Sequence, residues 1–248
     1  MPHFFINSKQ IFDNNIKISD KENYIHIARA LRAKCGEKLL LIDEKHIQYE
    51  TTIKEITNNS ITATINTSYP SKRFLDFELY LAQSPLRSDA QNLVVEKATE
   101  LGVNGIFPII TDNCALNKNI IEKKITKWQK IMYESSKQCE RAVVPKCYEP
   151  TSLSELLNSI KFDKIIVFCE RIATKTIRES FKEKPLIKSN KILIIIGPEG
   201  GFSQKEFDRF KANKRIEMLT LGNLILRAET AVTVAIGNII YEYSNFNK

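Results

Sequence analysis

The chain has 248 residues, of which 43% are apolar, and carries a formal net charge of +8 from 37 basic and 29 acidic side chains. This length suits one large domain or two modest ones, and the apolar fraction excludes wholesale disorder. The charge is densest between Lys118 and Lys146. It favours a polyanionic partner, RNA first, but lysines that only solvate a helix face explain it equally well.

The cysteines and the lack of long apolar stretches restrict the expected compartment. Five cysteines without a C-x-x-C pair, beside only three histidines, predict reduced structural thiols and no metal site. No basic stretch leads into an apolar segment at the start, and no window approaches the ~18 uninterrupted apolar residues of a membrane span. We therefore expect a cytoplasmic protein without metal or membrane contacts.

The first part of the chain has a strand-like pattern. Apolar and polar residues alternate over 47–53 and 61–65, which predicts a half-buried antiparallel sheet. One amphipathic helix is expected over 21–33, because its apolar residues fall at helical spacing and Gly36 follows. Residues 68–73, SYPSKR, have the composition of a linker.

From Phe74 onward strands alternate with helices, a pattern that predicts a mostly parallel α/β sheet. Helices are expected to begin at Ser88 and Ser203, each with Gln or Glu three residues later in capping-box spacing. A last helix is expected over 230–243. The expected buried strands span 77–83, 106–111, 164–169, 191–197 and 216–221.

The stretch KILIIIGPEGGFSQKEF at 191–207 runs from an apolar strand through glycines into a capped helix. Glycines let a ligand approach the backbone closely, although a plain strand-to-helix turn uses the same residues. The stretch lacks the Lys-Ser/Thr of a P-loop and the G-x-G-x-x-G spacing, and Glu199 would repel a pyrophosphate. A nucleoside cofactor without phosphates, such as S-adenosylmethionine, therefore fits better.

A second loop, TLGNLILRAETA at 220–231, combines one glycine, an apolar run and a lone arginine before the last helix. Its leucine and isoleucine side chains would supply the apolar walls that an adenine needs. Arg227 has two interpretations. In the first, Arg227 is a surface residue paired with Glu229, and Thr230 is an ordinary N-cap of the last helix. In the second, its guanidinium lies beside the cofactor and has a function there.

With both loops considered, the sequence resembles the RsmE family of bacterial 16S ribosomal RNA uridine methyltransferases, in the SPOUT superfamily. The resemblance rests on IGPEGGFS at 196–203, LGNLILRAETA at 221–231, EKATELGV at 96–103 and WQKI at 128–131. HFF at 3–5, ALR at 30–32 and the glycine before LLLID resemble the family's PUA-like RNA-binding barrel. These motifs follow one another at family spacing along nearly the whole chain.

The resemblance implies a small PUA-like β-barrel domain over 1–70 and a SPOUT methyltransferase domain over 74–248. The second is an α/β domain with a parallel sheet and a deep trefoil knot. An obligate homodimer is also implied, with S-adenosylmethionine held by the knot loops. The residues that the resemblance assigns to this cofactor are Ile196, Gly197, Gly200, Gly201, Leu221, Gly222, Ile225, Leu226 and Thr230.

The implied reaction moves a methyl group to nitrogen 3 of a uridine, which loses its proton on the way. Arg227 would stabilise the developing anion, and Glu229 or Glu199 would be near enough in sequence to accept the proton. Loss of the proton to water is the alternative. Contacts to 16S ribosomal RNA in the small subunit are expected from the basic residues Arg29, Arg32, Lys34, Arg87, Lys137 and Arg141.

The chain departs from the family pattern close to the expected site. Relatives usually carry Lys-Gly-Asp-Lys where this chain has Arg-Ser-Asp-Ala, ending at Ala90, and often Glu-Arg-Ser where it has Asp-Asn-Cys around Asn113. Leu224 replaces a common arginine. Two alternatives stay open: a related SPOUT methyltransferase acting on another RNA or base atom, and a non-catalytic RNA-binding protein of ribosome assembly. A nicotinamide or nucleoside-triphosphate enzyme is disfavoured because the phosphate-loop residues are missing.

Overall fold

The computed structural model describes residues 3–187 and 190–246. The chain divides into two compact units, each described by itself. The first takes in the described chain up to Phe74 together with Ser136–Val143, and the second takes in Leu75–Ser135 and the chain from Val144 onward. Residues 136–143 therefore belong to the first unit although they lie far along the sequence.

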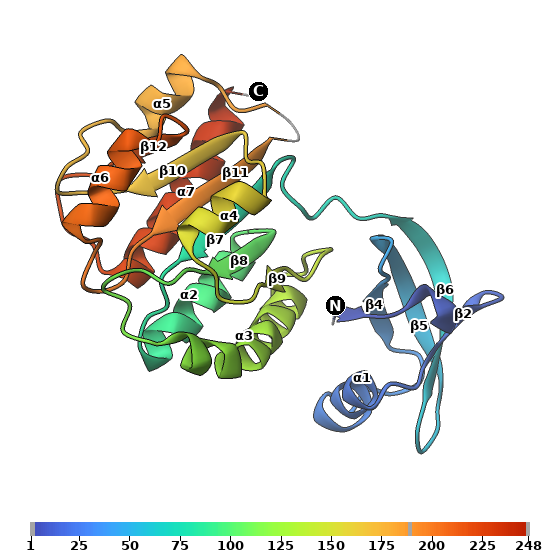
Figure 1. Ribbon diagram of the computed structural model, residues 1–248. Helices are drawn as coiled ribbons and strands as arrows, with labels where there is room; N and C mark the ends of the chain where they lie inside the picture. The colour runs from blue at the N-terminus through green and yellow to red at the C-terminus, as the bar shows by residue number, and fades with distance from the viewer. Residues whose placement is uncertain (1–2, 188–189, 247–248) are drawn as a thin grey trace. The chain divides into compact units, whose positions relative to one another are not determined.

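The first unit is built on a six-stranded sheet (Figure 1). Its elements are β1 (His3–Phe5), η1 (Ser8–Gln10), β2 (Ile11–Phe12), β3 (Asn15–Ile18), α1 (Lys21–Tyr24), η2 (Ile25–Ala30), β4 (Lys38–Ile42), β5 (Ile47–Ile56) and β6 (Ile61–Pro70). The strand order is β1-β4-β5-β6-β3-β2, with β1 parallel to β4 and the other neighbours antiparallel. Phe4, Ile16, Leu41 and Ile61 lie in its core, and Ile61 is one of the alternating apolar residues that predict this sheet.

The helical segment of this unit begins where the sequence predicts but changes character along its length. The Asp20 carboxylate caps it by accepting a hydrogen bond from the Asn23 N–H at 2.8 Å. The α-helix α1 passes into the π-helix η2, which buries Ile27 and ends at Ala30, before the predicted end. Arg32 then takes φ +51°, a left-handed conformation uncommon outside glycine, to turn the chain.

The linker predicted at 68–73 is wrong in its first residues, which still belong to β6. Tyr69 pairs with Gln48 and Pro70 with Ile47 at the end of that strand. Residues 66–70 are all exposed, so no buried face marks them as a strand in the sequence.

The second unit is an α/β domain. Its elements are β7 (Glu78–Gln83), α2 (Ser88–Glu100), β8 (Gly105–Pro108), α3 (Lys118–Gln138, whose last residues fall in the first unit), β9 (Lys146–Cys147), α4 (Leu153–Ser159), β10 (Lys164–Phe168), α5 (Ile177–Glu183), β11 (Lys191–Ile196), α6 (Gln204–Ala212), β12 (Ile216–Leu219) and α7 (Ala228–Phe246). The strand order is β12-β10-β11-β7-β8-β9, and neighbouring strands pair in parallel. The predicted buried strands correspond to β7, β8, β10, β11 and β12.

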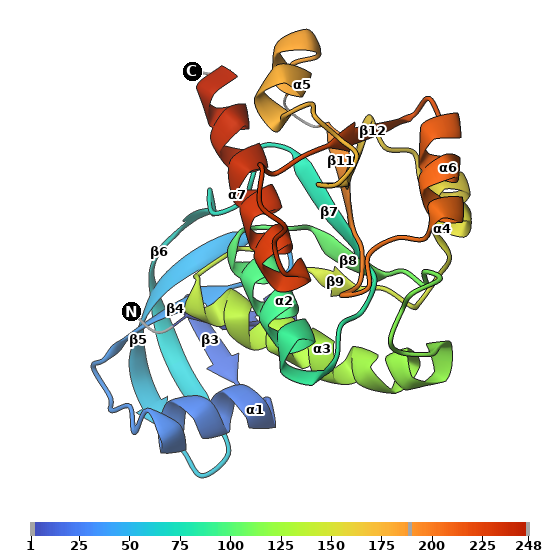
Figure 2. The same cartoon turned by 90° about the vertical axis from the view of Figure 1, so that its left-hand side faces the viewer.

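Helices cover both faces of this sheet (Figure 2). On one face, Leu81 and Ile194 belong to a core shared with α2, α3, α5 and α7. On the other, Ile195 packs with Leu156 of α4 and Phe210 of α6. Strands buried on both faces are continuous apolar runs, which is why KILIII was recognisable as a strand.

One of the two predicted capping boxes forms. The Ser203 hydroxyl accepts from the Glu206 N–H at 3.2 Å, and the Glu206 carboxylate accepts from the Ser203 N–H at 2.8 Å. The box predicted at Ser88 is wrong, because Arg87 is the N-cap residue and makes no side-chain cap. Gln91 Oε1 instead accepts from the backbone N–H of the buried Leu86 at 2.7 Å, so this side chain anchors the segment that enters the helix.

Candidate functional site

The two loops singled out in the sequence leave the same edge of the parallel sheet. The first follows β11 and the second follows β12, and β10 lies between these strands. Val167 of β10 pairs with Ile195 on one side and with Met218 on the other. Ligands of parallel α/β sheets bind at this edge, beyond the carboxyl ends of the strands.

The first loop has a tightly packed backbone. It begins at the buried Ile196, and the Gly201 N–H donates to the Pro198 carbonyl at 2.9 Å to close the turn. A Cβ at Gly200 would lie 3.2 Å from the Cβ of Asn113, closer than most side chains tolerate. Gly200 therefore lets a neighbouring segment approach the loop.

That neighbouring segment follows β8 and clamps the loop through side chains. Asn113 Nδ2 donates to the carbonyl oxygens of Gly200 at 3.3 Å and Gly201 at 3.1 Å. The Ser203 hydroxyl donates to Asp112 Oδ2 at 2.6 Å. Residues 112–113 thus hold both the glycine turn and the start of α6.

A second clamp comes from the segment after β7. The Ser84 N–H donates to the Ile196 carbonyl at 3.2 Å, and the Arg87 N–H donates to Glu199 Oε1 at 3.0 Å. One oxygen of Glu199 therefore has a structural task, joining the glycine loop to the entry of α2.

The second loop presents apolar side chains outward. Leu224 and Ile225 are 77% and 68% exposed, while Leu221 and Leu226 pack partly against the core of the sheet. Gly222 has φ +133°, which L side chains rarely adopt, and faces open space where a Cβ would stand. The second loop therefore exposes two adjacent apolar side chains beside a glycine.

Arg227 stands at the start of α7. Its carbonyl accepts the Ala231 N–H at 2.8 Å, and its side chain is exposed. Within the described residues it forms no ion pair, so the salt bridge to Glu229 does not form. Glu229 and Thr230 both lie in the first turn of α7, so Thr230 is not the N-cap. The positive charge of Arg227 therefore stands at the end of the helix where the helix dipole disfavours a cation.

The basic residues predicted to contact RNA differ in exposure. Lys137 and Arg141 of the first unit are only 7% and 8% exposed, and burial lowers the pKa of Arg141 to about 10. Both therefore lie largely inside the protein, against the expectation of free RNA-facing charges. The exposed candidates are Arg29, Arg32, Lys34 and Arg87.

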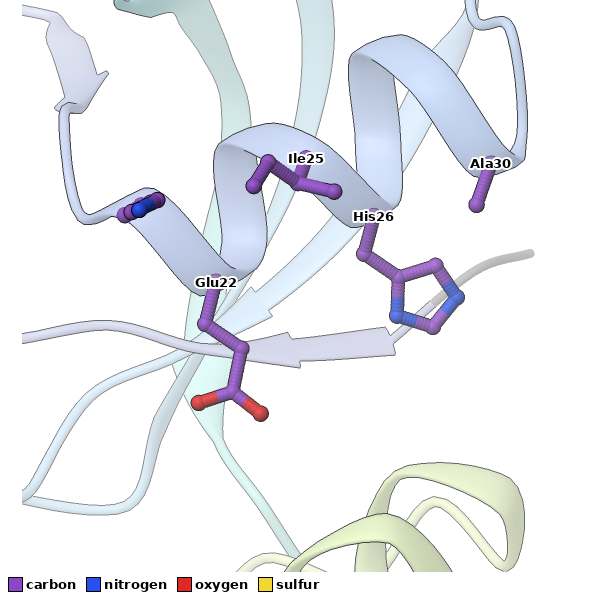
Figure 3. A pocket seen from close by; sticks show the side chains of 5 residues that line it. Glu22, Ile25, His26 and Ala30 are labelled. Carbon is purple, nitrogen blue, oxygen red and sulfur yellow. The ribbon is translucent and has the colours of Figure 1, made fainter.

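A hollow of about 540 Å³ opens on the helical segment of the first unit (Figure 3). Figure 3 shows Glu22 and His26 extending from the same side of the helix. Lys137 Nζ lies 3.3 Å from His26 Nδ1, and because an ammonium group only donates, this nitrogen accepts. The hollow is lined by Lys21, Glu22, Ile25, His26 and Ala30, none of which the sequence assigned to the cofactor.

The described cysteines are free thiols. Burial raises the pKa of Cys147 and of Cys169 to about 12, so both stay protonated and unreactive at neutral pH.

The part of the chain that the structure describes has no group of three or more His, Cys, Asp or Glu side chains able to hold a metal ion. None of its helices is long and apolar enough to cross a membrane.

Comparison with known proteins decides the family. The model of an RNA methyltransferase domain matches residues 74–240, and that of an RNA methyltransferase PUA domain matches residues 18–66. Ribosomal RNA small subunit methyltransferase E of Aquifex aeolicus is 30% identical over 184 residues, which are 74% of this chain and 74% of the relative. The chain belongs to this RNA methyltransferase family. The protein of the same name from Rickettsia conorii is 26% identical over 95% of this chain and 93% of its own length.

A solved structure agrees with the fold of this RNA methyltransferase. Ribosomal RNA small subunit methyltransferase E from Neisseria gonorrhoeae, bound to S-adenosyl methionine, has a TM-score of 0.80 at 24% identity, with 96% of both chains covered. At this identity the likeness concerns the fold alone. The predicted fold class, a parallel α/β methyltransferase domain after an N-terminal PUA-like domain, is confirmed.

The clamp on the glycine loop was missed in the sequence. In the sequence, Asp112 and Asn113 stand out only as departures from the family pattern, because their partners lie far away in the chain. Asn113 and Gly200 are 87 positions apart, so no local spacing reveals the contact. The sequence offers only a weaker indication of the contact. Asn113 and Gly200 each come soon after a buried strand, and the ligand-binding loops of parallel sheets follow the carboxyl ends of their strands.

Proposed function

We propose that this RNA methyltransferase uses S-adenosylmethionine to methylate ring nitrogen 3 of a uridine in 16S ribosomal RNA of the small subunit. The observation that carries the proposal is the pair of loops after β11 and β12, on either side of β10 at one sheet edge. Relatives named ribosomal RNA small subunit methyltransferase E support the substrate. We assign cofactor binding to a domain over 74–248 and RNA binding to a domain over 1–70.

The chemistry of the two loops fits S-adenosylmethionine. Leu224 and Ile225 offer exposed apolar surface for an adenine, and Gly222 leaves open space beside them. Neither GPEGGFS nor TLGNLIL contains a basic residue that could bind a phosphate. The residues proposed to hold the cofactor are Ile196, Gly197, Gly200, Gly201, Leu221, Gly222, Ile225, Leu226 and Thr230.

When bound, S-adenosylmethionine supplies an electrophilic methyl group. The protein stabilises the uracil as nitrogen 3 loses its proton. Arg227 and the free N–H groups at the start of α7 offer positive charge and donors to the negative charge that develops on a uracil oxygen. Glu229, half-buried in the first turn, is the proposed proton acceptor. Glu199 suits this task less, because its carboxylate already accepts a backbone hydrogen bond.

RNA contacts are proposed for the exposed basic residues. Arg29 lies on the same helical segment as the hollow, so phosphate contacts and apolar surface for a nucleobase stand together on the first unit. Lys137 and Arg141 are proposed to support this surface from within. The proposed contact residues are Arg29, Arg32, Lys34 and Arg87.

As the family resemblance implies, we propose that the protein is a homodimer. We also propose that it acts in the cytoplasm, where its ribosomal substrate is found.

The function is tested by incubating the purified protein with methyl-labelled S-adenosylmethionine and small ribosomal subunits that lack the modification. The RNA is then digested, and the labelled nucleoside is identified by mass spectrometry. We expect labelled 3-methyluridine. A different labelled nucleoside would indicate another base atom, and cofactor binding without label would indicate another RNA. No cofactor binding would contradict the proposal and favour a non-catalytic RNA-binding protein.

Replacing Asn113 by alanine is expected to weaken binding of S-adenosylmethionine about ten-fold. The change removes the donor to the Gly200 and Gly201 carbonyls, and two hydrogen bonds of about 0.7 kcal/mol each hold the loop in shape, which together correspond to about a factor of ten. Asn113→Asp should weaken binding further, because a carboxylate would face both carbonyl oxygens. Calorimetry measures the dissociation constants. Asn66→Ala, which removes an exposed amide contact to Thr52, is the control; equal affinities for Asn113→Ala and wild type would refute the clamp.

A further inference from the structure

Glu170 lies between the two proposed cofactor loops. It follows β10, the strand that separates β11 from β12. The Cys169 N–H still donates to the Leu219 carbonyl at 3.0 Å, so the chain keeps its register with β12 one residue before Glu170. The N–H groups of Ile172 and Ala173 then donate to the Cys169 carbonyl at 3.0 and 2.9 Å. This turn holds Glu170 at the carboxyl edge of the sheet.

One oxygen of this carboxylate has no hydrogen-bond partner among the described residues. Glu170 as a whole is half-buried, but its Oε1 atom is buried and makes no hydrogen bond within the described part of the chain. A buried carboxylate oxygen left without a donor is unfavourable. Glu217 of the neighbouring strand β12 shows the opposite case, since it accepts hydrogen bonds from Lys175 and Ser180. The unpaired oxygen of Glu170 therefore indicates a donor that a ligand supplies.

We infer that Glu170 binds the ribose hydroxyls of the nucleoside cofactor, an assignment that rests on the proposed function. The ribose is the middle of the molecule, joined to the adenine at one side and to the sulfur at the other. A residue between the two loops is placed to meet that middle part. Its two vicinal hydroxyls are donors that match a carboxylate, and acidic side chains near strand ends take this task in dinucleotide-binding sheets.

The test compares adenosine with 2′,3′-dideoxyadenosine by calorimetry on the full chain. We expect the wild type to bind adenosine about ten-fold more tightly than the dideoxy analogue. In Glu170→Ala the two affinities should become equal, and Glu170→Gln should keep part of the preference because its amide oxygen still accepts one hydrogen bond. Glu149→Ala, at an exposed glutamate, is the matched control and should behave as the wild type.

Two results would overturn the assignment. One is an unchanged preference for adenosine in Glu170→Ala. The other is a Glu170→Ala variant that loses affinity for S-adenosylhomocysteine but still binds 5′-methylthioadenosine as the wild type does. The second compound has the ribose and lacks the amino-acid part, so this result would mean that Glu170 binds the ammonium group. A wild type that binds neither S-adenosylmethionine nor adenosine would refute the proposed function itself, and with it this inference.

Stability gives a readout that is independent of binding. Since Glu170→Ala removes a buried carboxylate oxygen without a partner, the variant without ligand should unfold at the same temperature as the wild type or higher. Loss of ligand affinity together with a clearly lower unfolding temperature would instead assign Glu170 a structural role and contradict the inference.

Discussion

Replacing Arg227 by alanine is expected to lower the turnover number about 100-fold while leaving the affinity for S-adenosylmethionine unchanged. Removing one preorganised donor to a developing anion typically costs this much. Arg227 is exposed and makes no ion pair within the described chain, so its loss should not unfold the protein. Turnover is measured with small subunits as substrate, and cofactor affinity by calorimetry.

The control for this experiment is Arg209→Ala, at an exposed arginine of α6, which should change neither quantity. Arg227→Lys keeps the charge but loses the planar fork of donors, and it should recover only part of the activity. An Arg227→Ala variant with normal turnover would exclude a catalytic role. Parallel losses of turnover and cofactor affinity would move Arg227 to the cofactor site.

The sequence predicts the second unit well because its strands are buried on both faces. Such strands are apolar runs like KILIII, and the residues around Ser203 carry a complete capping signal that the structure confirms. The exposed end of β6 carries no such pattern, and the start of α2 uses Gln91 for a contact outside the helix. Sequence patterns therefore predict an element correctly when burial or capping within that element determines its structure, and they fail when a contact outside the element does.

The candidate site follows the same division. Its two loops were recognisable because glycines and an apolar run stand together in the sequence. The clamp by Asn113 and the position of Glu170 between the two loops depend on which strands are neighbours in the sheet. No local spacing of residues in the sequence reveals this strand order. The burial of Lys137 was equally hidden, since a lysine at the end of a charged helix gives no sign that residues 136–143 join the first unit.

The carboxylate of Glu217 holds together one end of the second unit. Its oxygens lie 3.0 Å from Lys164 Nζ and 2.6 Å from Lys175 Nζ, and the Ser180 hydroxyl donates to it at 2.7 Å. Lys164 is only 7% exposed, and its ammonium lies 5.4 Å from the centre of the Phe181 ring. Burial alone would raise the pKa of Glu217, but the hydrogen bonds from Lys175, Ser180 and Lys164 outweigh it and lower the pKa to about 2.

Glu217→Ala is therefore expected to lower the free energy of unfolding by about 3 kcal/mol at pH 7, because it leaves Lys164 buried without its carboxylate. Urea unfolding followed by circular dichroism measures the loss. Glu183→Ala is the matched control: its carboxylate lies 2.5 Å from Lys175 Nζ but is 67% exposed, so its removal should cost less than about 1 kcal/mol. A double change, Lys164→Met with Glu217→Leu, should recover most of the stability, since a buried ion pair replaced by apolar side chains is often neutral.

The same carboxylate predicts an acid dependence whose sign follows from its lowered pKa. A group with a folded-state pKa of about 2, against an ordinary value of 4.5, stabilises the fold fully above pH 4.5 and loses that contribution as the pH falls toward 2. The wild type should therefore lose more unfolding free energy than Glu217→Gln between pH 5 and pH 3, because the glutamine has no charge to lose. Parallel pH profiles for the two proteins would mean that other carboxylates govern acid unfolding and that the ion pair with Lys164 contributes little.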